Sequence, residues 1–118
     1  MKKQELFDVI KGSVIVSCQA LPDEPLYVEE KSIMYLMARA AKQAGTPAIR
    51  TNSVRDVVAI KEETGLPVIG LIKAHYDNSD VYITPTMKEV DQLVEANTDI
   101  VALDCTFSKR LNDTSINT

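Results

Sequence analysis

The chain has 118 residues, which is long enough for one compact domain and too short for two. Hydrophobic residues make up 45% and charged residues 25% of the sequence, a balance that excludes fibrous and disordered classes. The formal net charge of -4 argues against nucleic acid or an anionic membrane as the partner. The two cysteines, Cys18 and Cys105, match no metal spacing, and no segment resembles a signal peptide or a spanning helix. We therefore expect reduced thiols and a cytoplasmic protein.

Hydrophobic periodicity alternates between two patterns along the chain. Short apolar runs rich in β-branched residues predict strands buried on both faces, and apolar residues three and four positions apart predict amphipathic helices. Ser32, Ser53 and Thr86 are the predicted helix caps, and Gly45 and Gly65 are the predicted helix stops. In chain order, the predicted elements are a helix over 3–10, a strand over 14–18, a helix over 33–44, a very short strand at 48–49 that leads into a strand end and loop at 50–52, a helix between 53 and 65, a strand over 68–72, an extended piece over 81–83, a helix over 87–96 and a strand over 100–103.

The alternation of strands and helices predicts a parallel α/β sheet joined by right-handed crossovers. Two architectures fit the order, a doubly wound open sheet and part of a (β/α)₈ barrel. No glycine follows the first strand before Pro22, which argues against a Rossmann dinucleotide site. The domain is expected to span residues 1–106, and the polar segment 107–118 is expected to form a loose tail.

Polar side chains gather at one predicted edge of the sheet. Ser17, Gln19, Arg50, Lys73 and Asp104 fall at or just beyond the carboxyl ends of predicted strands. Both candidate architectures place their chemistry at that edge. Ser17 and Gln19 can hydrogen-bond a polar substrate, although turn-forming roles are equally compatible with the sequence.

Lys73 is the sharpest candidate, because it follows five apolar or glycine residues. Partial burial there would lower its pKa and suit it to act as a base or Schiff-base nucleophile, whereas a lysine that reaches water would have no such role. Arg50 can present a planar donor fork to a phosphate or carboxylate, or pair with a loop acid. Asp104 can orient Lys73, bind a substrate hydroxyl, or cap nearby backbone amides. His75 is the only histidine, so no metal pair is predicted.

Several blocks of the sequence, taken together, resemble the N-acetylmannosamine-6-phosphate 2-epimerase family. They lie in order and span nearly the whole chain. The blocks are residues 16–26 (VSCQALPDEPL), 48–52 (AIRTN), 70–73 (GLIK), 80–91 (DVYITPTMKEVD) and 102–104 (ALD).

The resemblance implies a (β/α)₈ barrel enzyme that converts N-acetylmannosamine 6-phosphate to N-acetylglucosamine 6-phosphate in sialic acid catabolism. The substrate would be a phosphorylated amino sugar, and no cofactor is needed to move a proton at carbon 2. Carried over residue by residue, the family pattern implies that Lys73 is the catalytic proton-transfer residue. It further implies that Arg50 and Gln19 bind substrate, and Asp104 matches a block that is also expected to serve the site.

The sequence departs from the family in length, because family members are roughly twice as long and a full barrel has about 250 residues. We therefore expect four strands, half of a TIM barrel, without the second half's catalytic glutamate and phosphate loops. Half a barrel leaves two unpaired edges, so a homodimer or a separate second half would have to cover them. The alternative is a catalytically inactive remnant or interaction module. A doubly wound binding domain is disfavoured, because no acidic cluster follows the first strand.

Overall fold

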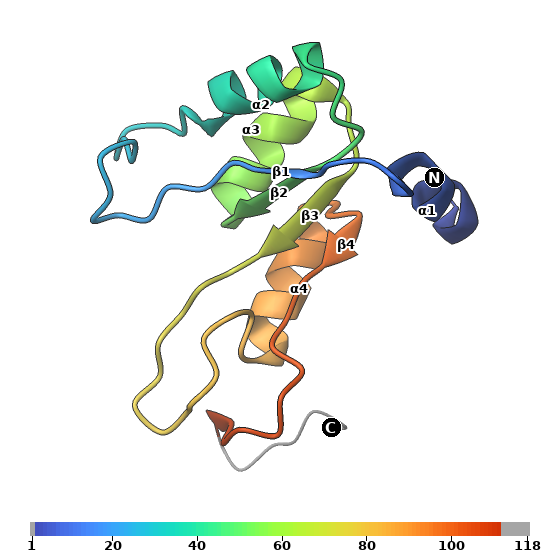
Figure 1. Cartoon of the computed structure of the whole chain (residues 1–118). Helices are drawn as coiled ribbons and strands as arrows, with labels where there is room; N and C mark the ends of the chain where they lie inside the picture. Colours follow the sequence, from blue (N-terminus) through green and yellow to red (C-terminus); the bar gives the residue numbers. More distant parts are fainter. Residues whose placement is uncertain (1, 112–118) are drawn as a thin grey trace.

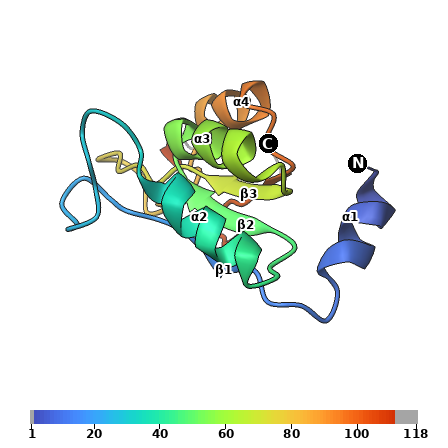
Figure 2. The same cartoon turned by 90° about the horizontal axis from the view of Figure 1, so that it is seen from above.

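The computed structural model describes residues 2–111 and shows a parallel sheet with helices on one side (Figure 1). Viewed from above, α2, α3 and α4 lie along the same face of the sheet, and α1 stands apart from them (Figure 2). The elements are α1 (Lys3–Ile10), β1 (Val16–Ser17), α2 (Met34–Gln43), β2 (Ile49–Asn52), α3 (Val54–Thr64), β3 (Val68–Leu71), α4 (Met87–Glu95) and β4 (Ile100–Val101).

The order of the strands distinguishes between the two architectures. The strands lie in the order β1-β2-β3-β4, and every neighbouring pair is parallel. A doubly wound sheet reverses its strand order at a switch point, whereas a barrel adds each strand beside the previous one. The sheet is therefore of the (β/α)-barrel type, with four strands in the described part of the chain, as the sequence predicted.

The hydrophobic core lies between the sheet and α2, α3 and α4. Ile49 and Val68 from the sheet and Val57, Ile60 and Leu93 from the helices are all fully buried. At a further position in β3 the helices come so close that no side chain fits. A Cβ built on Gly70 would lie 2.8 Å from Cγ2 of Thr98 and 3.1 Å from Cγ2 of Val57. The missing side chain of Gly70 thus lets α3 and α4 pack directly on β3.

Two of the three predicted helix caps are confirmed. The hydroxyl of Ser53 accepts a hydrogen bond from the backbone N–H of Asp56, and Thr86 forms a capping box with Glu89 at the start of α4. Gly65 ends α3 in the left-handed conformation that favours glycine. Ser32 differs from its prediction, because α2 begins one residue later and Ile33 occupies the cap position. The Ser32 hydroxyl still accepts from the backbone N–H of Met34, over 3.1 Å.

The first and last strands are shorter and more exposed than predicted. A strand buried on both faces was expected over 14–18, but Val14 is 76% exposed and Ser17 is also exposed. Likewise, β4 is only half-buried, and Leu103 beyond it is 37% exposed. The prediction was wrong here because among residues 2–111 helices cover one face of the sheet only, so a run of apolar residues does not imply burial on both faces.

Lys109 contacts the loop that follows β3. The backbone N–H of Asp80 donates to the carbonyl oxygen of Lys109 over 2.7 Å, and Arg110 is only 6% exposed. The rest of the predicted loose tail, residues 112–118, lies outside the described residues. The domain boundary at residue 106 stays a prediction. No described helix is long and apolar enough to cross a membrane.

Candidate active site at the carboxyl edge of the sheet

The register of the sheet separates its helix-covered face from its open face. Ser17, Arg50, Ile69 and Ile100 are mutual partners across the four strands, so they form one row. The neighbours of Arg50 in β2, Ile49 and Thr51, are buried against the helices. Because side chains alternate along a strand, the row that contains Arg50 points to the opposite, open face. Arg50 therefore lies half-buried on the open face, two residues before the end of β2 rather than at its end. Within residues 2–111 its guanidinium has no salt-bridge partner.

Lys73 lies just past the end of β3 and is half-buried. Its backbone N–H donates to Oδ1 of Asn52, at the end of β2, over 2.9 Å. It also forms an isolated antiparallel bridge with Ile83. In the described part of the chain, the ammonium group makes no hydrogen bond or ion pair, so it is available to a ligand.

The predicted extended piece over 81–83 returns along the end of β3. The backbone N–H of Ala74 donates to the carbonyl oxygen of Tyr82 over 3.0 Å, and that of Thr84 donates to Ile72 over 2.7 Å. On its other side, the same segment accepts a hydrogen bond from the backbone of Asp104 at Ile83, over 3.0 Å. The segment therefore lies between the continuations of β3 and β4 and widens the carboxyl edge of the sheet.

Asp104 takes the capping role that the sequence left open. Its Oδ1 accepts a hydrogen bond from the backbone N–H of Thr106 over 2.8 Å. Hydrogen bonds from the side chain and backbone of Thr106, with the nearby charge of Arg110, lower the pKa of Asp104 below its usual value. The Asp104 carboxylate is thus ionised and available at the edge, but the extended segment 81–83 lies between it and Lys73.

Gln19 presents an unused acceptor at the end of β1. Its Nε2 donates to the hydroxyl of Ser17 over 2.9 Å. Its Oε1 is buried and has no hydrogen-bond partner in the part of the chain that the structure describes. An unsatisfied buried carbonyl is costly, so a donor from a bound ligand would stabilise it.

Two residues at this edge were missed by the sequence analysis. Asn52 and Thr84 are both buried, at 7% and 2% exposure, and both bind the backbone around Lys73. Short polar residues at strand ends usually indicate turns, which hid these contacts. The available signal was position, since Asn52 comes two residues after Arg50 in the block that resembles the family.

No described group of three or more His, Cys, Asp or Glu side chains is placed to hold a metal ion. Cys18 is buried, Cys105 is exposed, and neither forms a disulfide. His75 stacks on the ring of Tyr82, with centroids 4.1 Å apart, and so packs on the extended segment 81–83.

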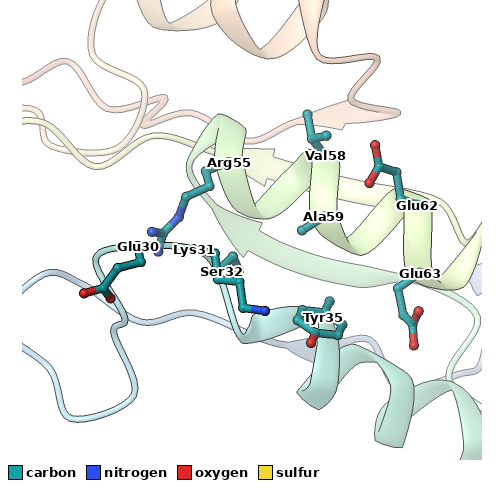
Figure 3. A pocket seen from close by; sticks show the side chains of 9 residues that line it. All are labelled: Glu30, Lys31, Ser32, Tyr35, Arg55, Val58, Ala59, Glu62 and Glu63. Carbon is teal, nitrogen blue, oxygen red and sulfur yellow. The ribbon is translucent and has the colours of Figure 1, made fainter.

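The outer helical layer carries a separate groove of about 510 Å³ between α2 and α3 (Figure 3). Arg55 closes one end of it, where its guanidinium lies over the ring of Tyr27 and donates to the carbonyl oxygen of Val28. Gln19, Arg50, Lys73 and Asp104 take no part in its lining. The groove is therefore distinct from the carboxyl-edge site. Its lining residues are Glu30, Lys31, Ser32, Tyr35, Arg55, Val58, Ala59, Glu62 and Glu63.

Polar side chains at the carboxyl edge of sequentially ordered parallel strands define a (β/α)-barrel type of site. The chain belongs to the family described as putative N-acetylmannosamine-6-phosphate epimerase, whose model matches residues 34–118. This confirms the family inferred from the sequence blocks.

Relatives and a solved structure agree with this family. A putative N-acetylmannosamine-6-phosphate 2-epimerase of Clostridium perfringens (strain 13 / Type A) is 54% identical over 111 residues, which are 94% of this chain and 49% of the relative. One of Oceanobacillus iheyensis is 51% identical over 92% of this chain and 48% of the relative. The solved N-acetylmannosamine-6-phosphate 2-epimerase from C. perfringens matches with a TM-score of 0.91 at 51% identity, over 98% of this chain and 50% of that one. The chain spans about half the length of the relatives it matches.

Proposed function

We propose that this chain supplies one half of the active site of an N-acetylmannosamine-6-phosphate 2-epimerase, with Lys73 as the catalytic base. The observation that carries the proposal is the half-buried Lys73 at the carboxyl edge, whose side-chain nitrogen has no protein partner within residues 2–111. The family supports the same assignment, because relatives that are 54% and 51% identical to this chain are named putative N-acetylmannosamine-6-phosphate 2-epimerases.

The proposed base acts on one face of the substrate, and the reaction needs a second group on the other face. Epimerisation at carbon 2 removes the proton next to the carbonyl of the open-chain sugar and returns a proton to the opposite face. As the proposed base, Lys73 accepts that proton on its side-chain nitrogen, and the resulting positive charge stabilises the enolate left on the sugar. A second acid on the other face must complete the inversion, and a single lysine cannot do so.

Arg50 and Gln19 are proposed to bind the sugar phosphate on the open face of the sheet. Arg50 offers a planar set of N–H donors that matches phosphate or carboxylate oxygens. Buried Oε1 of Gln19 accepts from a sugar hydroxyl, which would satisfy its missing hydrogen bond. Asp104, kept ionised by Thr106, accepts from another hydroxyl. No cofactor is required for this proton transfer, and a cytoplasmic location stays the prediction.

The site needs further strands to become a closed barrel. β1 and β4 each have one neighbour within the described residues, so each leaves a row of backbone groups unpaired. We propose that four strands from a second copy or from a separate half-barrel pair with these edges and bring the second acid. The open edges and open face equally suit a half-barrel module that assembles without turnover, which is the competing function.

Exchange at carbon 2 tests the proposed function directly. Purified protein is incubated with N-acetylmannosamine 6-phosphate in deuterated water, and the carbon-2 proton signal is followed by NMR. The expected result is that the carbon-2 proton signal is lost with the wild type and is retained with Lys73→Ala. The control Lys88→Ala, at an exposed position of α4, should lose the signal as the wild type does. Absence of exchange in the wild type, at concentrations where light scattering shows a dimer, would favour the non-catalytic module.

A further inference from the structure

The backbone of Lys73 is held by two buried side chains that come from opposite sides of β3. Oδ1 of Asn52 accepts from the backbone N–H of Lys73 over 2.9 Å. The hydroxyl of Thr84 accepts from the backbone N–H of the preceding residue, Ile72, over 3.2 Å and donates to the carbonyl oxygen of Ala102 over 2.6 Å. Two consecutive amides beyond the strand are thus satisfied by side chains rather than by the sheet ladder.

The reason lies in where the neighbouring strands end. The carbonyl oxygen of Leu71 still accepts a backbone hydrogen bond from Ser53, over 2.9 Å, but at Ser53 the chain turns into α3. Beyond that point β2 offers no main-chain acceptor to the N–H of Lys73. A buried amide without an acceptor is costly, and the side chain of Asn52 replaces the missing strand.

Thr84, on the other side of β3, is also held by burial and by hydrogen bonds. It is 2% exposed and has a φ of 47°, a left-handed conformation that is uncommon for a β-branched residue. Its backbone N–H donates to the carbonyl oxygen of Ile72 over 2.7 Å, while its hydroxyl connects the ends of β3 and β4. The surrounding contacts therefore hold Thr84 in a conformation that its residue type disfavours.

We infer that Asn52 is a positioning residue for Lys73, which it holds against β2 while Thr84 holds Ile72 from the other side. The inference rests on the proposed function, because it assigns Asn52 a role in the same proton transfer. A lysine side chain has four rotatable bonds, so a fixed Cα and backbone direction limit where its amine can reach. Release of one amide lets the amine move away from carbon 2, and a misplacement of about 1 Å typically costs about 100-fold in rate.

Three variants of the full 118-residue chain test the inference. Asn52→Ala removes the acceptor, Asn52→Asp keeps an acceptor oxygen at the same place, and Thr51→Val is the matched control. Thr51 is the preceding residue and is also buried, but its hydroxyl donates to the carbonyl oxygen of Cys18, away from Lys73. Amide hydrogen exchange by NMR reports the Lys73 N–H, and the carbon-2 exchange assay reports kcat and KM. Thermal unfolding shows whether each variant is folded.

The expected result is that Asn52→Ala loses protection at the Lys73 amide and lowers kcat by about 100-fold with KM changed little. Asn52→Asp should restore protection and most of the rate, and Thr51→Val should keep both. Unchanged protection and kcat in Asn52→Ala, or equal losses in Thr51→Val, would overturn the inference.

A wild type without carbon-2 exchange would instead refute the proposed function. The positioning is then decided by amide protection together with the resonance of Lys73 after reductive ¹³C-methylation. A shift of that resonance in Asn52→Ala, absent from Asn52→Asp and Thr51→Val, supports the inference. The same resonance in all variants overturns it.

Discussion

Lys73 pairs with Ile83 in an antiparallel bridge at the end of a sheet whose strand pairs are all parallel. The carbonyl oxygen of Ile83 accepts from the backbone N–H of Asp104 over 3.0 Å. Ile83 thus lies between Lys73 and Asp104, which follow the neighbouring strands β3 and β4. This spacing separates the proposed base from the nearest strand-end carboxylate and leaves the base available to substrate.

The separation predicts that Asp104 affects substrate binding and not the proton transfer at Lys73. Asp104→Asn keeps the shape and removes the charge, so KM should rise by about tenfold, as for a lost charged hydrogen bond. The pH dependence of kcat should stay that of the wild type. Carbon-2 exchange measured between pH 6 and 10 checks both, with Asp91→Asn on the exposed side of α4 as the control. A displaced pH profile in Asp104→Asn would mean that the carboxylate does act on the lysine.

The helices and the alternation of helices with strands were largely predictable, because their signals are local, whereas the barrel-type strand order followed only from the family resemblance. Apolar spacing together with Ser53 and Gly65 predicted a helix between 53 and 65, and α3 is observed within these limits. The first helix also matches its predicted bounds. The extents of β1 and β4 were not predictable in the same way. An apolar run shows that a strand can be covered on both faces, but not that a second layer is present to cover it.

The carboxyl edge was predictable in its members and not in its connections. Lys73 and Asp104 follow apolar runs, so their place at strand ends is a local property. The pairing of Ile83 with Lys73 joins residues from a loop and a strand, and no periodicity encodes it. Asn52 was missed for a related reason, since its acceptor role depends on β2 ending before β3 does.

The lowered pKa of Asp104 should depend on Thr106. Thr106→Val removes the hydroxyl that contributes most to the lowering, so the pKa of Asp104 should rise towards its ordinary value. The backbone N–H of Thr106 and the charge of Arg110 remain, so some lowering should persist. A folded pKa below the unfolded one stabilises the fold above the unfolded pKa, and this contribution is lost as pH falls through the folded pKa. Thr106→Val should therefore lose less stability on acidification.

Titration of the Asp104 carboxyl by ¹³C NMR measures this effect, and acid unfolding followed by circular dichroism measures its consequence. Ser108→Ala is the local control, because Ser108 contacts the Thr106 hydroxyl only through its own backbone N–H. A pKa of Asp104 that is the same in Thr106→Val and wild type would assign the lowering to the backbone N–H of Thr106 and the charge of Arg110 instead.

The two cysteines should differ strongly in reactivity. Cys18 is fully buried, and burial raises the pKa of its thiol, whereas Cys105 is exposed. Only the thiolate reacts, so iodoacetamide should modify Cys105 quickly and Cys18 only when the structure opens. Mass spectrometry of Cys18→Ser and Cys105→Ser separates the two rates. Equal rates in native protein would show that the sheet around Cys18 opens freely, and the two rates should converge in denaturant.

The close approach at Gly70 should make a single added methyl group destabilising. Gly70→Ala places a Cβ 2.8 Å from Cγ2 of Thr98 and 3.2 Å from Cδ2 of Leu93, so the free energy of unfolding should fall by about 1–3 kcal/mol. Thr98→Ser removes the nearest of these atoms, and the double variant should recover part of the loss. Urea unfolding of both single variants and the double variant measures the coupling. Strictly additive effects would mean that the Thr98 methyl group does not limit the space above β3, and a coupling of about 1 kcal/mol would show that it does.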